Sequence, residues 1–282
     1  MIKKPFKTIG IGVAFSPNLK ANLYEAARLA LFLDCKLVLI HVGKKSEDKI
    51  KTLKIILNPF KKDNLKYEVI FKSGNPVDVI LNASEEKNVD LLIIGAAKQE
   101  KFFTYYIGSI ARKITRRAKC SLLLLINPSL ERVPCQHIVV NGLMDPKTEQ
   151  TIATAFYIGA KLKAEKITIV EEIKQNEIHV KIDDDKSLRK TQIVKERLSN
   201  RERSRINHII EDIPEEYTKD IAIKSQPIFG TQGYSIGHYA QIARADLLVM
   251  NPPTKMTFWD RVFPHDIEHI LNELPTDVLI IQ

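Results

Sequence analysis

The residues of this chain best suited to binding chemistry are a glycine, Gly95, and a glycine–serine pair, Gly108 and Ser109. An apolar run over residues 91–94 ends at Gly95, and helical spacing of apolar residues begins after Ser109. A strand, a loop and a helix N-terminus in this order present backbone N–H groups and the positive end of a helix dipole to an anion, most often a phosphate. The spacing therefore predicts a phosphate-binding junction between residues 90 and 114.

The three cysteines are the next candidates for chemistry. Cys35, Cys120 and Cys135 make an odd number, include no C-x-x-C pair, and each lies beside a predicted strand. Free cysteines in such places usually act as small buried hydrophobic residues. We therefore expect neither a metal site nor a disulfide framework.

Strands and helices alternate along the first half of the chain. Apolar or alternating runs predict strands, and apolar residues at helical spacing predict helices. Ser46 and Asn75 are expected N-caps, and Pro76 fits the first position of a helix. The predicted strands cover residues 8–15, 36–42, 67–72, 91–94 and 121–126, and the predicted helices cover residues 19–33, 46–56 and 76–86 and a segment from residue 109. This order predicts an α/β fold with a parallel sheet and helices on both of its faces.

The same order of elements repeats after a linker at residues 127–134, which contains two prolines and no periodicity. The run VDLLIIG before the first loop has a counterpart, ADLLVMN, in the second half. The predicted strands cover residues 137–143, 166–173, 246–250 and 277–281 and a segment from residue 221, and the predicted helices end near residue 162 or cover residues 187–210 and 233–243. We therefore expect two tandem domains of one fold, at residues 1–128 and 135–282.

These features together resemble a tandem member of the universal stress protein family. Nucleotide-binding members carry G-x-x-G, nine residues, and then G-S or G-T. Here Gly95 is followed by Lys98 in place of the second glycine, then by nine residues, Gly108 and Ser109. The resemblance implies two five-stranded, mainly parallel open sheets of the adenine nucleotide alpha-hydrolase type, and ATP or another adenine nucleotide as ligand, with Mg²⁺ only alongside it. It assigns the contacts to Val13, Ala14, Val42, Gly95, Ala97, Lys98, Gly108, Ser109 and Ile110.

Two departures from the family pattern weaken the first site. Lys98 could meet a phosphate as a point charge, but its Cβ also limits how closely the loop backbone can approach a ligand. Relatives place an Asp that reads the adenine edge at the end of the first strand, and that position falls here on Ala14. We expect the phosphate subsite to be better preserved than the adenine subsite.

The second half keeps the spacing but loses the chemistry. Asn251, Thr254, Pro264 and His265 stand at the motif positions, and Gly142 stands where the Asp would be. Proline has no N–H to offer a phosphate. We therefore expect this half not to bind ATP in the family's manner, and we interpret His265 as a polar residue at a helix start.

Charge and loop composition leave other interpretations open. The chain carries a net charge of +9, with the excess of Lys and Arg in its first half. Arg112, Lys113, Arg116 and Arg117 form a basic helix face, which is either solvated or a contact for acidic surfaces. The charged helix at residues 187–210 is either solvated or partner-binding. The two loops also carry aromatic residues, which are expected either to pack internally or to contact a partner. These residues are Phe102, Phe103, Tyr105, Tyr106, Phe258, Trp259 and Phe263.

Three classes of function remain. The first is a nucleotide-responsive regulatory module, the second is an interaction or scaffold protein without nucleotide, and the third is a weak ATPase. No acid–base pair or nucleophile with a partner stands at the predicted strand ends, which disfavours the enzyme. The resemblance implies an intramolecular pseudo-dimer of the two domains, a homodimer of chains and an unidentified protein partner, and the basic and aromatic segments leave a peripheral membrane-protein contact open. Nucleic acid is disfavoured. With no signal peptide or spanning segment expected, the predicted location is cytoplasmic.

Overall fold

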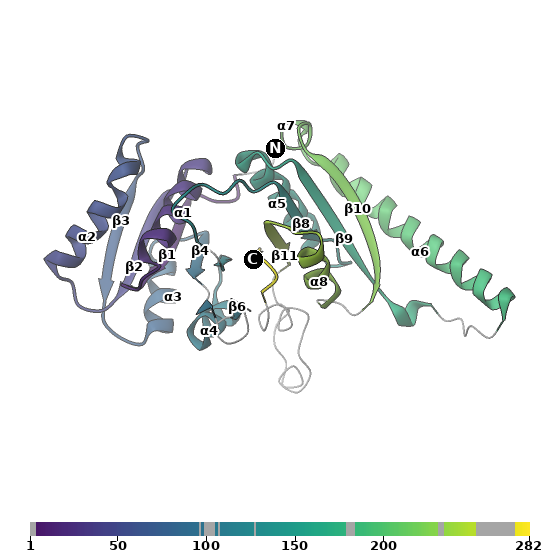
Figure 1. Cartoon of the computed structure of the whole chain (residues 1–282), viewed down its shortest axis with the longest axis horizontal. Coiled ribbons are helices and arrows are strands. Elements are labelled where there is room, and N and C mark those ends of the chain that lie inside the picture. Colours follow the sequence, from purple (N-terminus) through teal and green to yellow (C-terminus); the bar gives the residue numbers. More distant parts are fainter. Residues whose placement is uncertain are drawn as a thin grey trace. The chain divides into compact units, whose positions relative to one another are not determined.

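The computed structural model describes residues 4–95, 97–98, 105–106, 108–126, 128–178, 184–230, 234–251 and 274–282. These residues form two compact units (Figure 1). Within the described part, the N-terminal unit comprises residues 4–134 and 274–282, and the C-terminal unit comprises residues 135–251.

The N-terminal unit is built on a parallel sheet with strand order β3-β2-β1-β4-β7. Helix α1 packs with α2, and α3 packs with α4, so that a pair of helices covers each face of the sheet. This arrangement explains why β2 and β4 are apolar along nearly their whole length. The elements are β1 (Thr8–Val13), α1 (Leu19–Phe32), β2 (Lys36–Val42), α2 (Glu47–Leu57), the 3-10 helix η1 (Asn58–Lys61), β3 (Tyr67–Lys72), α3 (Pro76–Glu86), β4 (Leu91–Gly95), α4 (Ser109–Arg117) and β7 (Ser121–Leu125).

Local signals set where two of these helices begin. The Ser46 hydroxyl accepts a hydrogen bond from the Lys49 N–H at 3.3 Å, and Asn75 Oδ1 accepts from the Val77 N–H at 3.0 Å. Pro76 occupies the first turn of α3. The predicted caps are confirmed, because each side chain satisfies an N–H group that the helix itself leaves unpaired.

A short hairpin lies within the segment predicted to be a loop. Strand β5 (Ala97–Lys98) pairs antiparallel with β6 (Tyr105–Tyr106), with Lys98 opposite Tyr105. Lys98 therefore lies in extended backbone, which any residue can adopt.

The last strand of the chain joins the N-terminal unit. Strand β12 (Asp277–Ile280) pairs antiparallel with β7, with Val278 opposite Leu124. The Asp277 carboxylate also accepts a hydrogen bond from the Ile126 N–H at 2.8 Å. The repeat in the sequence places this strand at the end of the second domain, whereas its contacts group it with the first unit.

The C-terminal unit repeats the parallel order, with strands β10-β9-β8-β11. Its core includes Phe156 of α5, which is fully buried against the sheet. The elements are β8 (His137–Asn141), α5 (Thr148–Leu162), β9 (Lys166–Lys174), the 3-10 helix η2 (Gln175–Glu177), α6 (Asp185–Glu211), α7 (Glu215–Thr218), β10 (Ala222–Gly230), α8 (Tyr234–Ile242) and β11 (Leu247–Met250).

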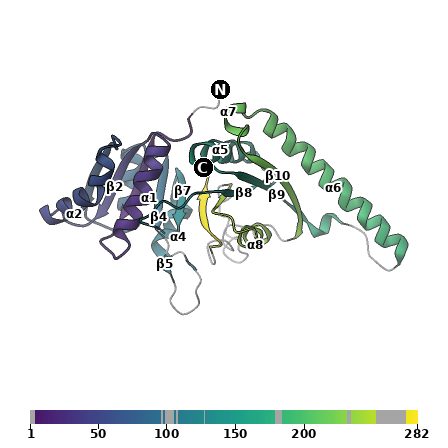
Figure 2. The same cartoon turned by 45° about the horizontal axis from the view of Figure 1, so that its top comes forward.

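Helix α6 confirms the long charged helix expected at residues 187–210. A capping box closes its start: Asp184 accepts from the Ser187 N–H at 2.7 Å, and the Ser187 hydroxyl accepts from the Asp184 N–H at 3.0 Å. Along its 27 residues only Thr191, Glu202 and Ile206 are buried. Figures 1 and 2 show α6 running beside β10 while its N-terminal end reaches away from the strands.

The linker is fixed to α1. The Arg28 guanidinium donates to the carbonyl oxygens of Ser129 at 3.0 Å and Glu131 at 2.9 Å, and Glu25 accepts from the Ser129 N–H at 3.1 Å. Residues 128–134 are thus held by side chains instead of secondary structure. In the part of the chain that the structure describes, no helix combines the length and the apolar character needed to span a bilayer.

Candidate functional site

The carboxyl edge of the N-terminal sheet brings the predicted site residues together. Because β1 pairs in parallel with both β2 and β4, the ends of these strands meet at one edge. The strand order reverses between β1 and β4, which is where ligands bind in open α/β sheets. Val13 is buried, Val42 is half-buried, and Ala14 and Gly95 are exposed.

The start of α4 supplies the phosphate-binding character that the sequence predicts. Gly108 is the N-cap and has no side chain with which to satisfy the N–H groups of the first turn. A Cβ placed on Gly108 would meet no atom of a described residue within 4 Å. Ser109 and Ile110 are exposed, and the first turn carries no acidic residue. An anion would find unpaired N–H groups and the positive end of the helix dipole here.

A polar side chain from α1 lies against the bare backbone of Gly95. A Cβ on Gly95 would lie 3.3 Å from both Nδ2 and Oδ1 of Asn22. Asn22 Oδ1 is buried and has no hydrogen-bond partner. An unpaired buried amide oxygen costs about 1–3 kcal/mol unless a ligand or a water satisfies it. The bare backbone at position 95 therefore lets the Asn22 amide approach closely, and a buried polar group stays unsatisfied beside the strand end.

A fixed cluster forms the wall beneath the ends of β1 and β2. His41 Nδ1 lies 2.9 Å from the Val13 carbonyl oxygen, and Nε2 lies 3.0 Å from Lys49 Nζ. Since a carbonyl only accepts, Nδ1 carries the proton and Nε2 accepts from the ammonium group. The Lys49 ammonium group also lies 5.6 Å from the ring centre of Phe15. These contacts hold the strand ends in place without using Ala14 or Val42.

The remaining predicted contacts are placed only by their backbone. Ala97 and Lys98 form β5, and their side chains lie outside the described residues. The side chains of the loop aromatics of both halves, and those of Thr254, Pro264 and His265, also lie outside the described residues.

The comparison with protein families identifies this segment. Residues 45–125 match the family model described as the universal stress protein family, and they include β4, the start of α4 and β7. This segment of the chain therefore carries a domain of the universal stress protein family.

Individual relatives agree. A universal stress protein from Helicobacter pylori is 39% identical over 63 residues, which make up 22% of this chain and 44% of the relative. The chain spans less than half the length of the curated relatives it matches.

Solved structures extend the likeness to both units. A protein of unknown function from Pseudomonas aeruginosa PAO1 has a TM-score of 0.71 at 15% identity, covering 99% of this chain and 93% of that one. A universal stress protein from Archaeoglobus fulgidus has a TM-score of 0.64 at 16% identity, covering 98% of both chains. At these identities the likeness shows the fold alone.

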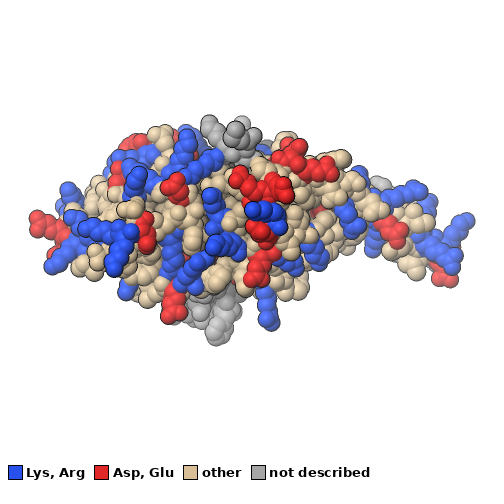
Figure 3. Space-filling model, turned by 90° about the horizontal axis from the view of Figure 1, so that it is seen from above, with Lys and Arg blue, Asp and Glu red and all other residues tan. Residues whose placement is uncertain are grey.

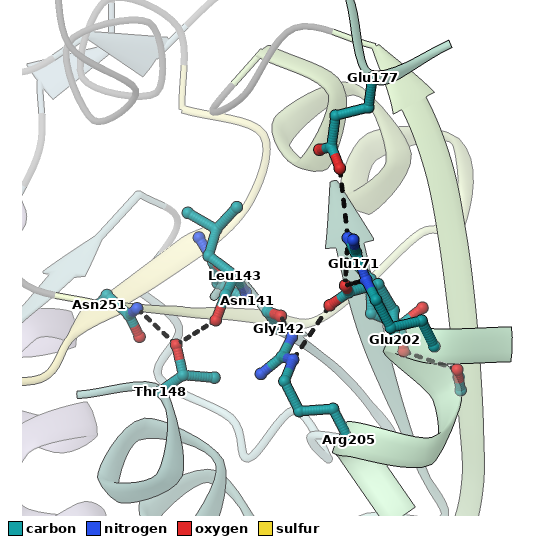
Figure 4. A network of polar contacts seen from close by, with 11 residues as sticks. Asn141, Gly142, Leu143, Thr148, Glu171, Glu177, Glu202, Arg205 and Asn251 are labelled. Carbon is teal, nitrogen blue, oxygen red and sulfur yellow. Dashed lines mark hydrogen bonds and ion pairs between the residues drawn. The ribbon is translucent and has the colours of Figure 1, made fainter. Parts of the chain in front are cut away.

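At the corresponding edge of the C-terminal unit, polar side chains form a network of contacts (Figure 4). Asn251, which replaces the first glycine of the motif, donates from Nδ2 to the Thr148 hydroxyl at 2.9 Å. That hydroxyl in turn donates to the Leu143 carbonyl at 2.6 Å. A Cβ at Gly142 would lie 2.9 Å from Ile169 Cγ2 and 3.1 Å from the Val170 carbonyl oxygen. The Asp of nucleotide-binding relatives would clash with the sheet at position 142.

Buried charges hold α6 on this unit. Arg205 donates to the Gly142 carbonyl and, at 3.0 Å, to Glu202, whose carboxylate also pairs with Arg201 at 2.7 Å. Nearby, Glu171 is 1% exposed and accepts from the Ser225 hydroxyl at 2.6 Å, while its second oxygen has no partner. Burial away from water raises the pKa of Glu171. The seat of α6 is therefore largely polar.

A cavity of about 400 Å³ lies between α6 and the loop after β8. Its walls carry the carboxylates of Asp145, Glu149 and Asp212 and the guanidinium group of Arg205. The cavity offers no matched set of groups for a triphosphate.

Two of the three cysteines, Cys35 and Cys120, have thiol groups with a raised pKa. Burial raises the pKa of the Cys35 thiol to about 11, and it raises that of Cys120 to about 11 as well. Among the described residues no group of three or more His, Cys, Asp or Glu could hold a metal ion.

Sequence reasoning missed Asn22, His41 and Arg205. For Asn22 a signal was present, because it stands on the same helical face as the buried residues Leu19, Leu23 and Ala26. A polar residue on such a face needs a partner or a function. No local pattern marked His41 or Arg205, since their partners lie elsewhere in the chain.

Proposed function

We propose that this protein binds an adenine nucleotide, ATP first among them, at the carboxyl edge of its N-terminal unit and acts as a nucleotide-responsive regulatory protein. The observations that carry the proposal are the unpaired Asn22 amide oxygen packed against the backbone of Gly95 and the start of α4, where no N-cap side chain bonds the first turn. In this proposal the N–H groups after Gly108 and the Ser109 hydroxyl bind the phosphates.

The base would rest on the apolar ends of β1 and β2. Val13, Ala14 and Val42 offer van der Waals contact but no hydrogen bond from a side chain. Asn22 is the nearest described polar group to Gly95 and would supply one. Most of the affinity would then come from the phosphate end, and Mg²⁺ would arrive with the nucleotide.

Binding is favoured over turnover. Around Gly95 and Ser109, the described part of the edge shows no nucleophile held by a base and no pair of carboxylates. Any hydrolysis would therefore be slow, and the expected effect of the nucleotide is to stabilise one state of the protein.

A thermal shift experiment tests the proposal. At about a hundredfold excess over Kd, ATP should stabilise the protein by about 2.7 kcal/mol and raise the melting temperature by several degrees. Gly108→Arg should abolish the shift because its side chain occupies the phosphate position. Ile55→Arg, at a 63% exposed position on α2, is the matched control and should leave the shift intact. If neither ATP, ADP nor AMP shifts the wild-type protein, the proposal fails.

A further inference from the structure

Helix α6 is far longer than the surface of the C-terminal unit on which it packs. Its 27 residues span roughly 40 Å at 1.5 Å per residue. Leu188 and Ile206 lie about five turns apart and thus on the same face of the helix. Ile206 is fully buried, whereas Leu188 is 53% exposed. In the N-terminal half of α6 the first turn therefore lies away from the core, as Figure 2 also shows, while Thr191 stays buried.

The outward face of this half carries a row of cations, which we call the α6 basic stripe. Lys186, Arg189, Lys190 and Arg197 follow one another at helical spacing around Ile193 and cover about 16 Å of the helix. All four cations are exposed, and none forms an ion pair with a described residue. In Figure 3, Lys and Arg predominate at the right-hand end, where α6 begins.

Several other cations of the molecule form ion pairs. Lys36 pairs with Glu68 at 3.1 Å, Arg117 pairs with Asp78 at 2.7 Å, and further along α6 Arg201 pairs with Glu202 at 2.7 Å. The α6 basic stripe thus concentrates unpaired positive charge on a rigid, capped helix.

We infer that the α6 basic stripe binds an acidic, amphipathic helix of a partner protein. Ile193, 49% exposed, sits among the cations and would pack against an apolar residue of the partner. Glutamates or aspartates on both sides of that residue would pair with the cations. This pattern of an apolar seam flanked by opposite charges sets partner choice between helices.

The composition of α6 disfavours two other anionic partners. The helix has no Trp, Tyr or Phe. A helix that lies on a lipid surface needs a broad apolar face, usually with aromatic residues, and single-stranded nucleic acid is held by stacking on aromatic side chains. The exposed Leu188 and Ile193 also lie on opposite sides of α6, so they cannot enter a membrane together.

Binding to defined probes tests the inference with the full chain. The first probe is a synthetic helical peptide with a leucine once per turn and glutamates on both sides. The others are a double-stranded DNA, a single-stranded RNA and vesicles containing phosphatidylserine. We expect the peptide to bind most tightly, measured by fluorescence anisotropy at physiological salt.

Two variants locate the site. Reversing all four charges of the stripe (K186E, R189E, K190E and R197E) should weaken peptide binding about tenfold or more, because each exposed ion pair contributes a few-fold. Ile193→Asp should weaken it as well. Circular dichroism and melting temperature should stay close to the wild-type values, since the seat around Ile206 is untouched.

Matched controls separate the stripe from general electrostatics. Reversing Lys51, Lys54, Lys61 and Lys62, which are exposed in the other unit, changes the net charge equally. Ile55→Asp places the same new carboxylate at an exposed apolar position of α2. Both controls should retain peptide binding.

Three outcomes would overturn the inference. One is the absence of peptide binding to the wild-type chain. Another is an equal loss of binding in the controls, which would indicate non-specific attraction. The third is tighter binding of nucleic acid or vesicles that the stripe variant abolishes, which would assign the stripe to that class of partner instead.

Discussion

The two units place different side chains at the same point of the same fold. In the N-terminal unit β4 ends at Gly95, and the Asn22 amide beside it makes no side-chain hydrogen bond. In the C-terminal unit β11 is followed by Asn251, whose amide is bonded through Thr148 to the loop after β8. One edge keeps an amide that makes no hydrogen bond, while the other edge joins its amide to neighbouring groups.

The two edges differ in whether their polar groups are bonded within the protein or left unpaired. A hydrogen bond made within the protein stabilises the fold by about 1 kcal/mol, whereas one left unmade costs more. The C-terminal edge has made most of its bonds, although Asn251 Oδ1 still lacks a partner. The N-terminal edge retains the cost of an unpaired amide oxygen, which a bound nucleotide would remove. This is the difference expected between a binding site and an edge that has lost its binding function.

Importing the C-terminal residue should have the largest effect. Gly95→Asn would place a Cβ 3.3 Å from the Asn22 amide and fill the space beside it. We expect the whole nucleotide-induced stabilisation to disappear, about 2.7 kcal/mol at a hundredfold excess of ATP over Kd. Isothermal titration calorimetry measures the loss. A variant that still binds ATP normally would show that the open edge is irrelevant.

Breaking the closed edge should cost stability. Thr148 is fully buried, and Thr148→Val removes the hydroxyl that joins Asn251 to Leu143. Because two half-buried polar groups lose their partner, we expect a cost of about 2 kcal/mol in urea unfolding. Thr115→Val in α4 is the control, since the Thr115 hydroxyl bonds only the Ala111 carbonyl of its own helix at 2.9 Å. Equal costs for the two variants would contradict the closed-edge interpretation.

The surfaces on which α2 and α6 pack also differ in polarity, and the contribution of the α6 surface to stability should depend on pH. Helix α2 buries Leu53, Ile56 and Leu57, whereas α6 lies over the buried carboxyl group of Glu171. Burial raises the pKa of Glu171, so the folded state holds its proton more strongly than the unfolded chain. The stability from this group is complete below the unfolded pKa of about 4.3 and is lost as the pH rises through the folded pKa.

Glu171→Gln should remove that dependence. An amide has no charge to desolvate, so we expect the variant to be more stable than wild type by about 1 kcal/mol near neutral pH, and to lose the advantage in acid. Urea unfolding across the acidic and neutral range gives the answer. A variant less stable than wild type at neutral pH would mean that ionised Glu171 is paired.

The smallest expected effect concerns Asn22 in the absence of ligand. Because its amide makes no hydrogen bond within the protein, Asn22→Ala should change the free energy of unfolding by less than about 0.5 kcal/mol. The nucleotide-induced shift should nevertheless fall. A loss of stability well above that amount, with an unchanged response to ATP, would assign Asn22 to packing alone.

Local signals account for most of what the sequence predicts correctly. Strands β2 and β3 begin and end where the pattern of apolar residues indicates, and Ser46 and Asn75 cap their helices as expected. Each of these features depends on residues a few positions apart. The coarse fold follows from their order, and the family model and the solved structures agree with it.

Features that depend on residues far apart in the sequence could not be predicted from it. The hairpin β5–β6 depends on pairing across a loop, and the partner of β12 is a strand of the other half of the sequence. At the candidate site, the position of Gly95 was predicted but its neighbour Asn22 was not. A spacing of glycines indicates where backbone can approach a ligand, and it carries no information about which side chain another helix brings there.

Strand β12 also has a consequence for the order of folding. Its residues are synthesised after the whole C-terminal unit, yet they cover the edge of β7, which is complete far earlier. An uncovered sheet edge readily pairs with another chain. During synthesis the N-terminal unit therefore exposes β7 for as long as the following unit takes to emerge. We expect the protein to be most prone to aggregation in the interval between the synthesis of β7 and that of β12. Changes at residues 277–280 should therefore reduce the yield of the folded N-terminal unit more than that of the C-terminal unit.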